Sequence, residues 1–144
     1  MGKNIKRKVA IFDIDGTIFR SSFLIEIVEE LIAAGIFPVQ AREEYEHLHV
    51  QWIDRTGEYE PYIDAMVQTF HKYIKGVPYT ELIEAGERVV QKQKSRVYRY
   101  TRDLIADLKG KGYFLLAISQ SPKDVLDKFC THLGFDKVYG RIYE

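Results

Sequence analysis

The apolar positions of the chain form two short continuous runs, separated by a long stretch with helical spacing. The first run occupies 9–12 (Val-Ala-Ile-Phe) and ends at Asp13, close to a turn glycine. A continuous run bounded by turn residues is typical of a strand that is covered on both faces. The second run, at 113–118, ends at Ser119 and predicts another buried strand, and a third strand is expected to begin near 137.

Between the two runs, apolar residues recur every three or four positions, which is the period of an amphipathic helix. The spacing predicts four consecutive helices, which begin near Ser21, Gln40, Tyr59 and Thr80. Glycines follow several of the periodic stretches and are expected to end them. We interpret these tyrosine-rich helices as one compact insertion.

The pattern changes again after the insertion. A short helix is predicted at 101–109, ahead of the second strand, and another begins after Ser121 and ends at Gly134. Ser121 is interpreted as the side-chain cap of that last helix rather than as a ligand, because Pro122 and Asp124 complete a capping pattern.

The order of the predicted elements defines the fold class. Strand, helices, strand, helix, strand is an α/β order with a parallel sheet. We therefore expect an α/β core that is built from 1–20 and 96–144 and interrupted by a helical domain at 21–95.

Composition narrows the class of protein. The 144 residues are 46% hydrophobic and 29% charged, which suits one ordinary domain's worth of chain with a buried core. The 21 basic and 21 acidic residues cancel, which argues against broad electrostatic binding of nucleic acid or membrane. A single cysteine, Cys130, excludes an internal disulfide and a thiolate zinc cluster. No apolar run approaches a membrane span or a signal peptide, so we expect a soluble, cytoplasmic protein.

Polar residues capable of chemistry follow the first two predicted strands. Asp13, Asp15 and Thr17 come after the first strand, and Ser119 after the second. Ligand-binding groups in open α/β sheets gather beyond the carboxyl ends of the strands. Two carboxylates two residues apart can serve as a nucleophile, a proton-transfer group and a magnesium site. The plainer alternative is a strand-ending turn that uses common turn residues.

A known pattern matches these residues. The stretch Phe12-Asp13-Ile14-Asp15-Gly16-Thr17-Ile18, followed about a hundred residues later by Leu115-Leu116-Ala117-Ile118-Ser119-Gln120-Ser121-Pro122, resembles the haloacid dehalogenase (HAD) superfamily of aspartate-nucleophile phosphatases. The helical block at 21–95 resembles the cap of its phosphoserine-phosphatase-like branch. The resemblance implies a HAD-like Rossmannoid parallel sheet core with an inserted α-helical cap.

The resemblance also implies a role for each carboxylate. Asp13 is the implied nucleophile, which attacks phosphorus and forms an aspartyl-phosphate. Asp15 protonates the leaving alkoxide and later deprotonates the attacking water. Mg²⁺ is the implied cofactor, held by the Asp13 carboxylate and the Asp15 backbone carbonyl. It is needed because an anionic nucleophile and a phosphate dianion repel each other unless their charge is neutralised.

The residues with an implied part in phosphate binding are Ile14, Thr17, Ser119 and Gln120. Ser119 is expected to hydrogen-bond a phosphate oxygen, and Thr17 to lie near Asp13 and hold the loop. The backbone amide of Ile14 is expected to face the same phosphate, together with the amide that follows it.

Two motifs of the family are not matched. The third motif, a lysine or arginine, and the fourth, an acidic pair after a later strand, would follow beyond Glu144. The sequence therefore resembles a truncated member. Loss of one electrostatic donor typically lowers a rate about 100- to 1000-fold, so we expect weak or no activity from this chain alone.

The leading hypothesis is magnesium-dependent hydrolysis of a small phosphate monoester, with a phosphorylated metabolite as the partner and neither nucleic acid nor membrane. Arg42 and Arg55 are candidate substrate-binding arginines by location alone. Two alternatives stay open: a phosphotransferase that uses the same aspartyl-phosphate, and a non-catalytic HAD-fold binding module. An exposed sheet edge is also expected to allow homo-oligomerisation.

Overall fold

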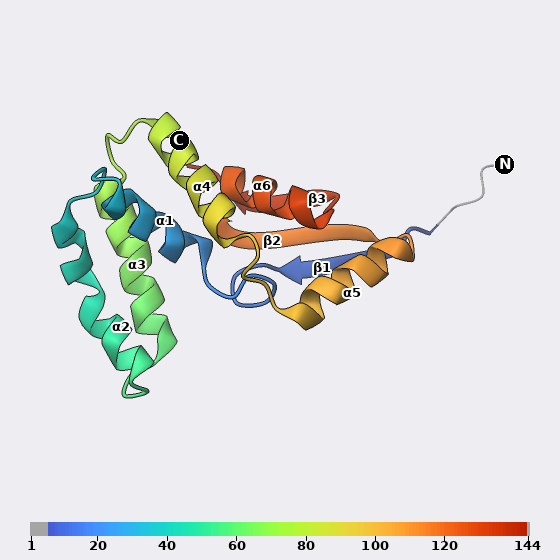
Figure 1. Ribbon diagram of the computed structural model, residues 1–144, viewed down its shortest axis with the longest axis horizontal. Helices are drawn as coiled ribbons and strands as arrows, with labels where there is room; N and C mark the ends of the chain where they lie inside the picture. Colours follow the sequence, from blue (N-terminus) through green and yellow to red (C-terminus); the bar gives the residue numbers. More distant parts are fainter. Residues whose placement is uncertain (1–5, 144) are drawn as a thin grey trace. The chain divides into compact units, whose positions relative to one another are not determined.

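The computed structural model describes residues 6–143. Its elements, in chain order, are β1 (Val9–Asp13), α1 (Phe23–Ala33), the 3-10 helix η1 (Val39–Glu44), α2 (Glu46–Ile53), α3 (Tyr59–Tyr73), α4 (Tyr79–Gln93), α5 (Arg99–Gly110), β2 (Phe114–Pro122), α6 (Lys123–Leu133) and β3 (Lys137–Arg141) (Figure 1). Backbone contacts divide the chain into two compact units. We call Met1–Ser22 with Val90–Glu144 the α/β unit and Phe23–Val89 the helical unit, and α4 crosses the boundary between them.

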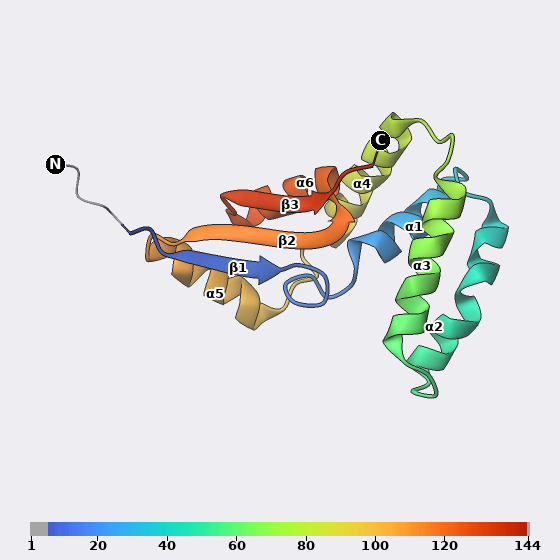
Figure 2. The same ribbon diagram turned by 180° about the vertical axis from the view of Figure 1, so that it is seen from behind.

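A three-stranded parallel sheet organises the α/β unit, with β2 between β1 and β3 (Figure 2). The register places Asp13 of β1 opposite Ile118 of β2, and Ile118 opposite Tyr139 of β3. The pairing shifts between Ile118 and Pro122, where β2 is irregular before it reaches Arg141. The predicted α/β class with a parallel sheet is confirmed.

The two faces of the sheet differ in burial. Helices α5 and α6 both contact β2 and also contact each other, and on that side Leu115 and Ala117 are fully buried. Both helices belong to crossovers that run in the same direction along the sheet. Because such crossovers are right-handed, they place their helices on the same face. The opposite face leaves Ile11 63%, Ile118 47% and Tyr139 54% exposed. The expectation of strands covered on both faces is therefore wrong for the described part of the chain.

The core of the α/β unit lies between the sheet and its helices. Phe19 and Phe129 meet edge to face with ring centroids 5.7 Å apart, and both are fully buried. Cys130 is buried beside Phe129, as predicted, and burial raises the pKa of its thiol to about 12. Helix α6 ends as predicted at Gly134, whose φ of +84° lets the amide of Phe135 return to the carbonyl of Cys130.

The helical unit packs apolar stripes of α1 and α3 together. Its fully buried side chains include Phe23, Ile27, Leu31, Met66 and Phe70. The helix predicted to begin near Gln40 is in fact two segments, η1 and α2, which meet at Tyr45. Tyr45 leaves the helical conformation (φ −134°), and its side chain is almost fully buried. No helix in the described part of the chain combines the length and the apolar character needed to cross a membrane.

Candidate functional site

The loop that follows β1 is closed tightly on itself. The carbonyl of Ile14 accepts the amides of Ile18 (2.9 Å) and Phe19 (3.0 Å). The amide of Gly16 returns to the carbonyl of Phe19 at 2.9 Å, and Gly16 adopts the left-handed φ of +75° that this turn requires. Ile14, Ile18 and Phe19 are fully buried and anchor the loop in the core. The backbone that bears the neighbouring carboxylates is therefore held in place by buried side chains and by hydrogen bonds within the loop.

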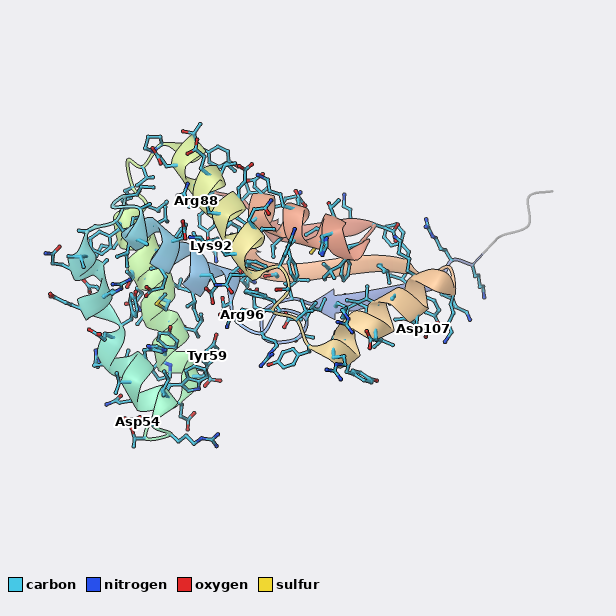
Figure 3. The ribbon with its side chains drawn as sticks, viewed as in Figure 1. Asp54, Tyr59, Arg88, Lys92, Arg96 and Asp107 are labelled. Carbon is cyan, nitrogen blue, oxygen red and sulfur yellow. The ribbon has the colours of Figure 1, made fainter. Side chains whose placement is uncertain are left out.

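A second segment of the α/β unit, residues 96–101, makes hydrogen bonds to the same loop. The amide of Arg20 donates to the carbonyl of Arg96 at 2.8 Å, and the amide of Tyr98 donates to the carbonyl of Ile18 at 2.9 Å. The Thr101 hydroxyl donates to the carbonyl of Thr17 at 2.9 Å. Arg96, labelled in Figure 3, lies just ahead of α5. Sequence reasoning missed this contact because backbone groups make most of it and leave no residue pattern.

Two carboxylate clusters stand where β1 and β2 end. The Thr17 hydroxyl donates to Asp13 Oδ2 at 3.0 Å. The Ser119 hydroxyl donates to Asp15 Oδ2 at 2.5 Å. Asp13 is exposed, whereas Asp15 and Ser119 are half-buried. The parallel pairing of β1 with β2 brings these groups to the same end of the sheet, as the sequence predicts.

Ser121 adds a third hydroxyl, which sequence reasoning did not assign to this site. Its Oγ lies 3.2 Å from Asp15 Oδ1 and 3.1 Å from Asp15 Oδ2, and its backbone amide donates to Ser119 Oγ at 3.0 Å. The prediction that Ser121 caps the next helix is wrong. Pro122 occupies the cap position and no side chain caps the helix, because β2 continues through its register shift as far as Pro122.

The remaining predicted site residues lie as follows. The side chain of Ile14 is fully buried, and its backbone carbonyl accepts the hydrogen bonds that close the loop. Gln120 is exposed, and its side chain makes no hydrogen bond within the described residues. Ser119 directs its hydroxyl to Asp15, whereas the sequence predicts that this hydroxyl binds a phosphate oxygen. Roles in phosphate binding stay predictions for all three.

The donor atoms of the loop suit magnesium, although they do not form a closed cage. Within residues 6–143, no cluster of three or more histidine, cysteine, aspartate or glutamate side chains could hold a metal ion. Asp13 and Asp15 offer carboxylate and carbonyl oxygens, the donor type that Mg²⁺ prefers. Mg²⁺ is often held by one or two protein carboxylates together with the phosphates of a substrate. The pair therefore fits a magnesium ion that an anionic ligand helps to bind.

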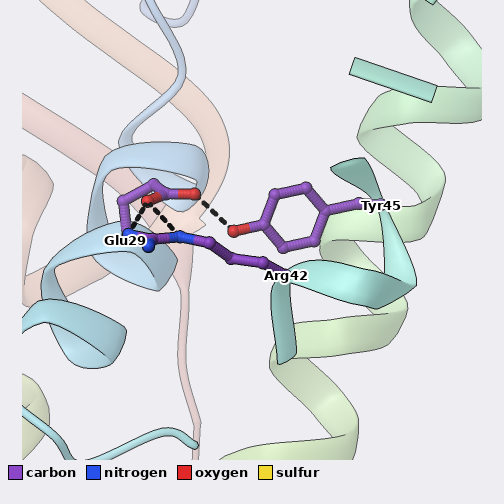
Figure 4. A network of polar contacts seen from close by, with 3 residues as sticks. All are labelled: Glu29, Arg42 and Tyr45. Carbon is purple, nitrogen blue, oxygen red and sulfur yellow. Dashed lines mark hydrogen bonds and ion pairs between the residues drawn. The ribbon is translucent and has the colours of Figure 1, made fainter. Parts of the chain in front are cut away.

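In the helical unit, Arg42 is engaged in an internal network (Figure 4). Its Nε and Nη2 donate to Glu29 Oε2 at 3.2 and 2.8 Å, and the Tyr45 hydroxyl donates to Glu29 Oε1. The hydrogen bond to Glu29 raises the pKa of Arg42. Burial, followed by the same carboxylate, raises the pKa of Tyr45. These contacts join α1 to η1 and make Arg42 a structural group.

Arg55, the other candidate arginine, is exposed where α2 gives way to α3. It has a left-handed φ of +57°, a conformation that glycine adopts more readily. It lines a shallow hollow with Trp52 and Tyr59, and Figure 3 labels Tyr59. Its role in substrate binding stays a prediction.

Comparison with known proteins gives one family match. The family model described as haloacid dehalogenase-like hydrolase matches residues 10–144. No curated protein matches the chain.

Several solved structures share the fold. A protein with unknown function from Bordetella pertussis Tohama I aligns with a TM-score of 0.66 and 14% identity, over 96% of this chain and 61% of its own. A phosphoserine phosphatase from T. onnurineus aligns with a TM-score of 0.53 and 24% identity, over 100% of this chain and 62% of its own. A phospho-aspartyl intermediate analogue of phosphoserine phosphatase aligns with a TM-score of 0.53 and 21% identity, over 94% and 56%. The chain thus spans about three fifths of the length of these proteins.

Proposed function

We propose a function from one premise, which is that the chain belongs to the haloacid dehalogenase-like hydrolase family. The proposed reaction is magnesium-dependent hydrolysis of a small phosphate monoester through an aspartyl-phosphate on Asp13. One observation carries the proposal: the paired ends of β1 and β2 bring Asp13 with Thr17, and Asp15 with Ser119, to one end of the sheet. The chain spans 56–62% of the solved structures described above, so activity of the 144-residue chain itself is part of the proposal.

The proposed reaction has two steps that share one proton carrier. In the first, a carboxylate oxygen of Asp13 attacks phosphorus, the bond to the leaving oxygen breaks, and protonated Asp15 gives that oxygen its proton. In the second, the Asp15 carboxylate takes a proton from water, whose oxygen attacks phosphorus as the bond to Asp13 breaks. The products are an alcohol and inorganic phosphate, and both carboxyl groups return to their starting protonation.

The surrounding residues prepare this chemistry by fixing positions. Thr17 orients the Asp13 carboxylate through its hydrogen bond, and Ser119 orients that of Asp15. Groups held in a reactive geometry remove part of the entropic barrier. When bound to the Asp13 carboxylate and the Asp15 carbonyl, Mg²⁺ would neutralise charge between the nucleophile and the phosphoryl group.

The substrate is proposed only as a class. Several solved relatives are named phosphoserine phosphatases, at 21–24% identity, which makes phosphoserine one ester to test beside others. Aryl and alkyl phosphates are to be tested beside it as representatives of the same class.

Hydrolysis of an aryl phosphate, with Mg²⁺ and with a chelator, tests the proposed function. We expect Mg²⁺-dependent release of phosphate that Asp13→Asn abolishes, because the amide cannot act as the nucleophile. Asp107→Asn is the matched control: it removes an exposed carboxylate on α5 (Figure 3) and should leave the rate unchanged.

Two outcomes would contradict the proposal. Turnover retained by Asp13→Asn would move the nucleophile elsewhere. No turnover by the folded chain with either an aryl phosphate or phosphoserine would favour a binding module.

A further inference from the structure

Three hydroxyls hydrogen-bond to the two carboxylates of the loop. Thr17 donates to Asp13, and the other two hydroxyls both bond to Asp15. Ser119 donates to Asp15 at 2.5 Å, while Ser121 lies 3.1 and 3.2 Å from the two Asp15 oxygens. A serine hydroxyl has a single proton to donate. As long as Ser119 donates to Asp15, it cannot donate to a phosphate oxygen as well.

Ser119 and Ser121 differ in exposure and in backbone restraint. Ser119 is half-buried and stands on the strand ahead of Ser121, whereas Ser121 is 3% exposed. The backbone amide of Ser121 is held by Ser119 Oγ, and Pro122 restricts the conformation of the residue before it. Ser119 is thus the hydroxyl that a ligand can reach, and Ser121 is the one that is fixed.

We infer that Ser121 is a positioning residue, which keeps the Asp15 carboxylate in place while Ser119 turns its hydroxyl to the phosphoryl group. The inference rests on the proposed function, because it assigns Ser121 to the orientation of the proton-transfer group and Ser119 to phosphate binding in that reaction. Without Ser121, a ligand that draws Ser119 away would also remove a hydrogen bond that orients Asp15. Proton transfer to the leaving oxygen depends on the position of that carboxyl group.

Steady-state kinetics separate the two serines. We expect Ser121→Ala to lower kcat about tenfold or more with KM unchanged, as for loss of a hydrogen bond to a charged group. Ser121→Thr, which keeps the hydroxyl, should recover most of kcat. Ser119→Ala should instead weaken competitive inhibition by inorganic phosphate, by about tenfold for the same reason. Equal effects of Ser119→Ala and Ser121→Ala on kcat and on phosphate inhibition would overturn the inference.

A matched control excludes a general effect of losing a buried hydroxyl. Thr69 is 1% exposed, and its hydroxyl donates to the carbonyl of Ala65 within α3 at 2.8 Å. Thr69→Ala should therefore leave kcat and phosphate inhibition unchanged. If Ser121→Ala fails to fold, Ser121→Cys fills the site with a somewhat larger thiol, which is a much weaker donor, and should show the same loss of kcat.

A structural measurement separates this inference from the proposed function. If the natural chain shows no turnover, the proposed function fails, and crystal structures of the natural chain and Ser121→Ala, each with inorganic phosphate, still test the role of Ser121. We expect Asp15 to keep its position in the natural chain and to leave it in the variant. An Asp15 side chain that occupies the same position in both structures would contradict the inference.

Discussion

The two units each hold a carboxylate against hydroxyl groups, and they do so with different partners. In the helical unit, Glu29 receives two hydrogen bonds from the Arg42 guanidinium and one from the Tyr45 phenol. In the α/β unit, Asp15 receives the hydroxyls of Ser119 and Ser121. A guanidinium neutralises the carboxylate that it binds, whereas a serine hydroxyl orients a carboxylate and leaves its charge in place.

This difference separates a structural use of a carboxylate from a chemical one. The Glu29 network links two neighbouring elements and has a matched charge, so its loss should appear in stability. The Asp15 cluster stands on a loop beside Asp13 at the ends of β1 and β2, so its loss should appear in rate. The comparison fails if a variant of either carboxylate shows the effect expected of the other.

Among the changes that test this comparison between the two units, Asp15→Asn should have the largest effect. An amide cannot carry the proton between the leaving oxygen and water, and loss of a general acid–base group typically lowers a rate about 100- to 10,000-fold. The measurement is Mg²⁺-dependent hydrolysis of an aryl phosphate, together with urea unfolding. A large drop in the free energy of unfolding, with the rate retained, would make Asp15 a structural residue like Glu29.

Alkaline pH should act on both units through buried acids, among them Cys130 and Tyr62. Burial raises the pKa of Cys130, in the α/β unit, from 9.0 to about 12, and that of Tyr62, in the helical unit, from 10.0 to about 12. Because the unfolded chain loses these protons first, the stabilisation is complete below pH 9.0 and is lost as the pH rises toward about 12.

Urea unfolding of the natural chain, Cys130→Ala and Tyr62→Phe across this range checks the alkaline prediction. Cys130→Ala should remove the fall that begins near pH 9.0, and Tyr62→Phe should reduce the part that begins near pH 10.0, to which buried Tyr45 also contributes. Parallel pH profiles for all three proteins would show that neither acid is responsible.

Glu29→Gln should have the smallest effect, because Glu29 and Arg42 are each about two fifths exposed. The change leaves the Arg42 charge unmatched, and we expect the free energy of unfolding to fall by about 1 kcal/mol, with kcat unchanged. Urea unfolding and aryl phosphate hydrolysis measure the two quantities on one sample. A loss of rate with stability intact would place Glu29 in the chemistry.

Local pattern was enough to predict the parallel sheet and to place the candidate site residues at one end of it. The strands at 9–12 and 113–118 are short apolar runs whose character depends on their own residues, and Gly134 ends its helix through its own conformational freedom. Asp13, Asp15 and Ser119 were predicted to lie together because parallel strands deliver their carboxyl ends to one edge of a sheet, and their roles stay predictions.

The features that were predicted wrongly depend on partners distant in sequence. Ser121 has the local pattern of a helix cap, yet a register shift in β2 turns it toward Asp15, more than a hundred residues earlier. Tyr45 divides a predicted helix, and its hydroxyl donates to Glu29, which lies on another helix. The exposed face of the sheet follows from the strand order, which single runs of apolar residues do not encode. At Ser121 the local rule fails inside the site itself, where such conflicts are expected.

The most direct test of the account is to identify the residue that carries phosphate during turnover. The chain would be mixed with an aryl phosphate and Mg²⁺, quenched, reduced with borohydride, which converts an aspartyl-phosphate to homoserine, and mapped by peptide mass spectrometry. The account predicts homoserine at Asp13, and none at Asp15 or in an unreacted sample. Turnover accompanied by an unmodified Asp13, or by modification at another residue, would contradict it.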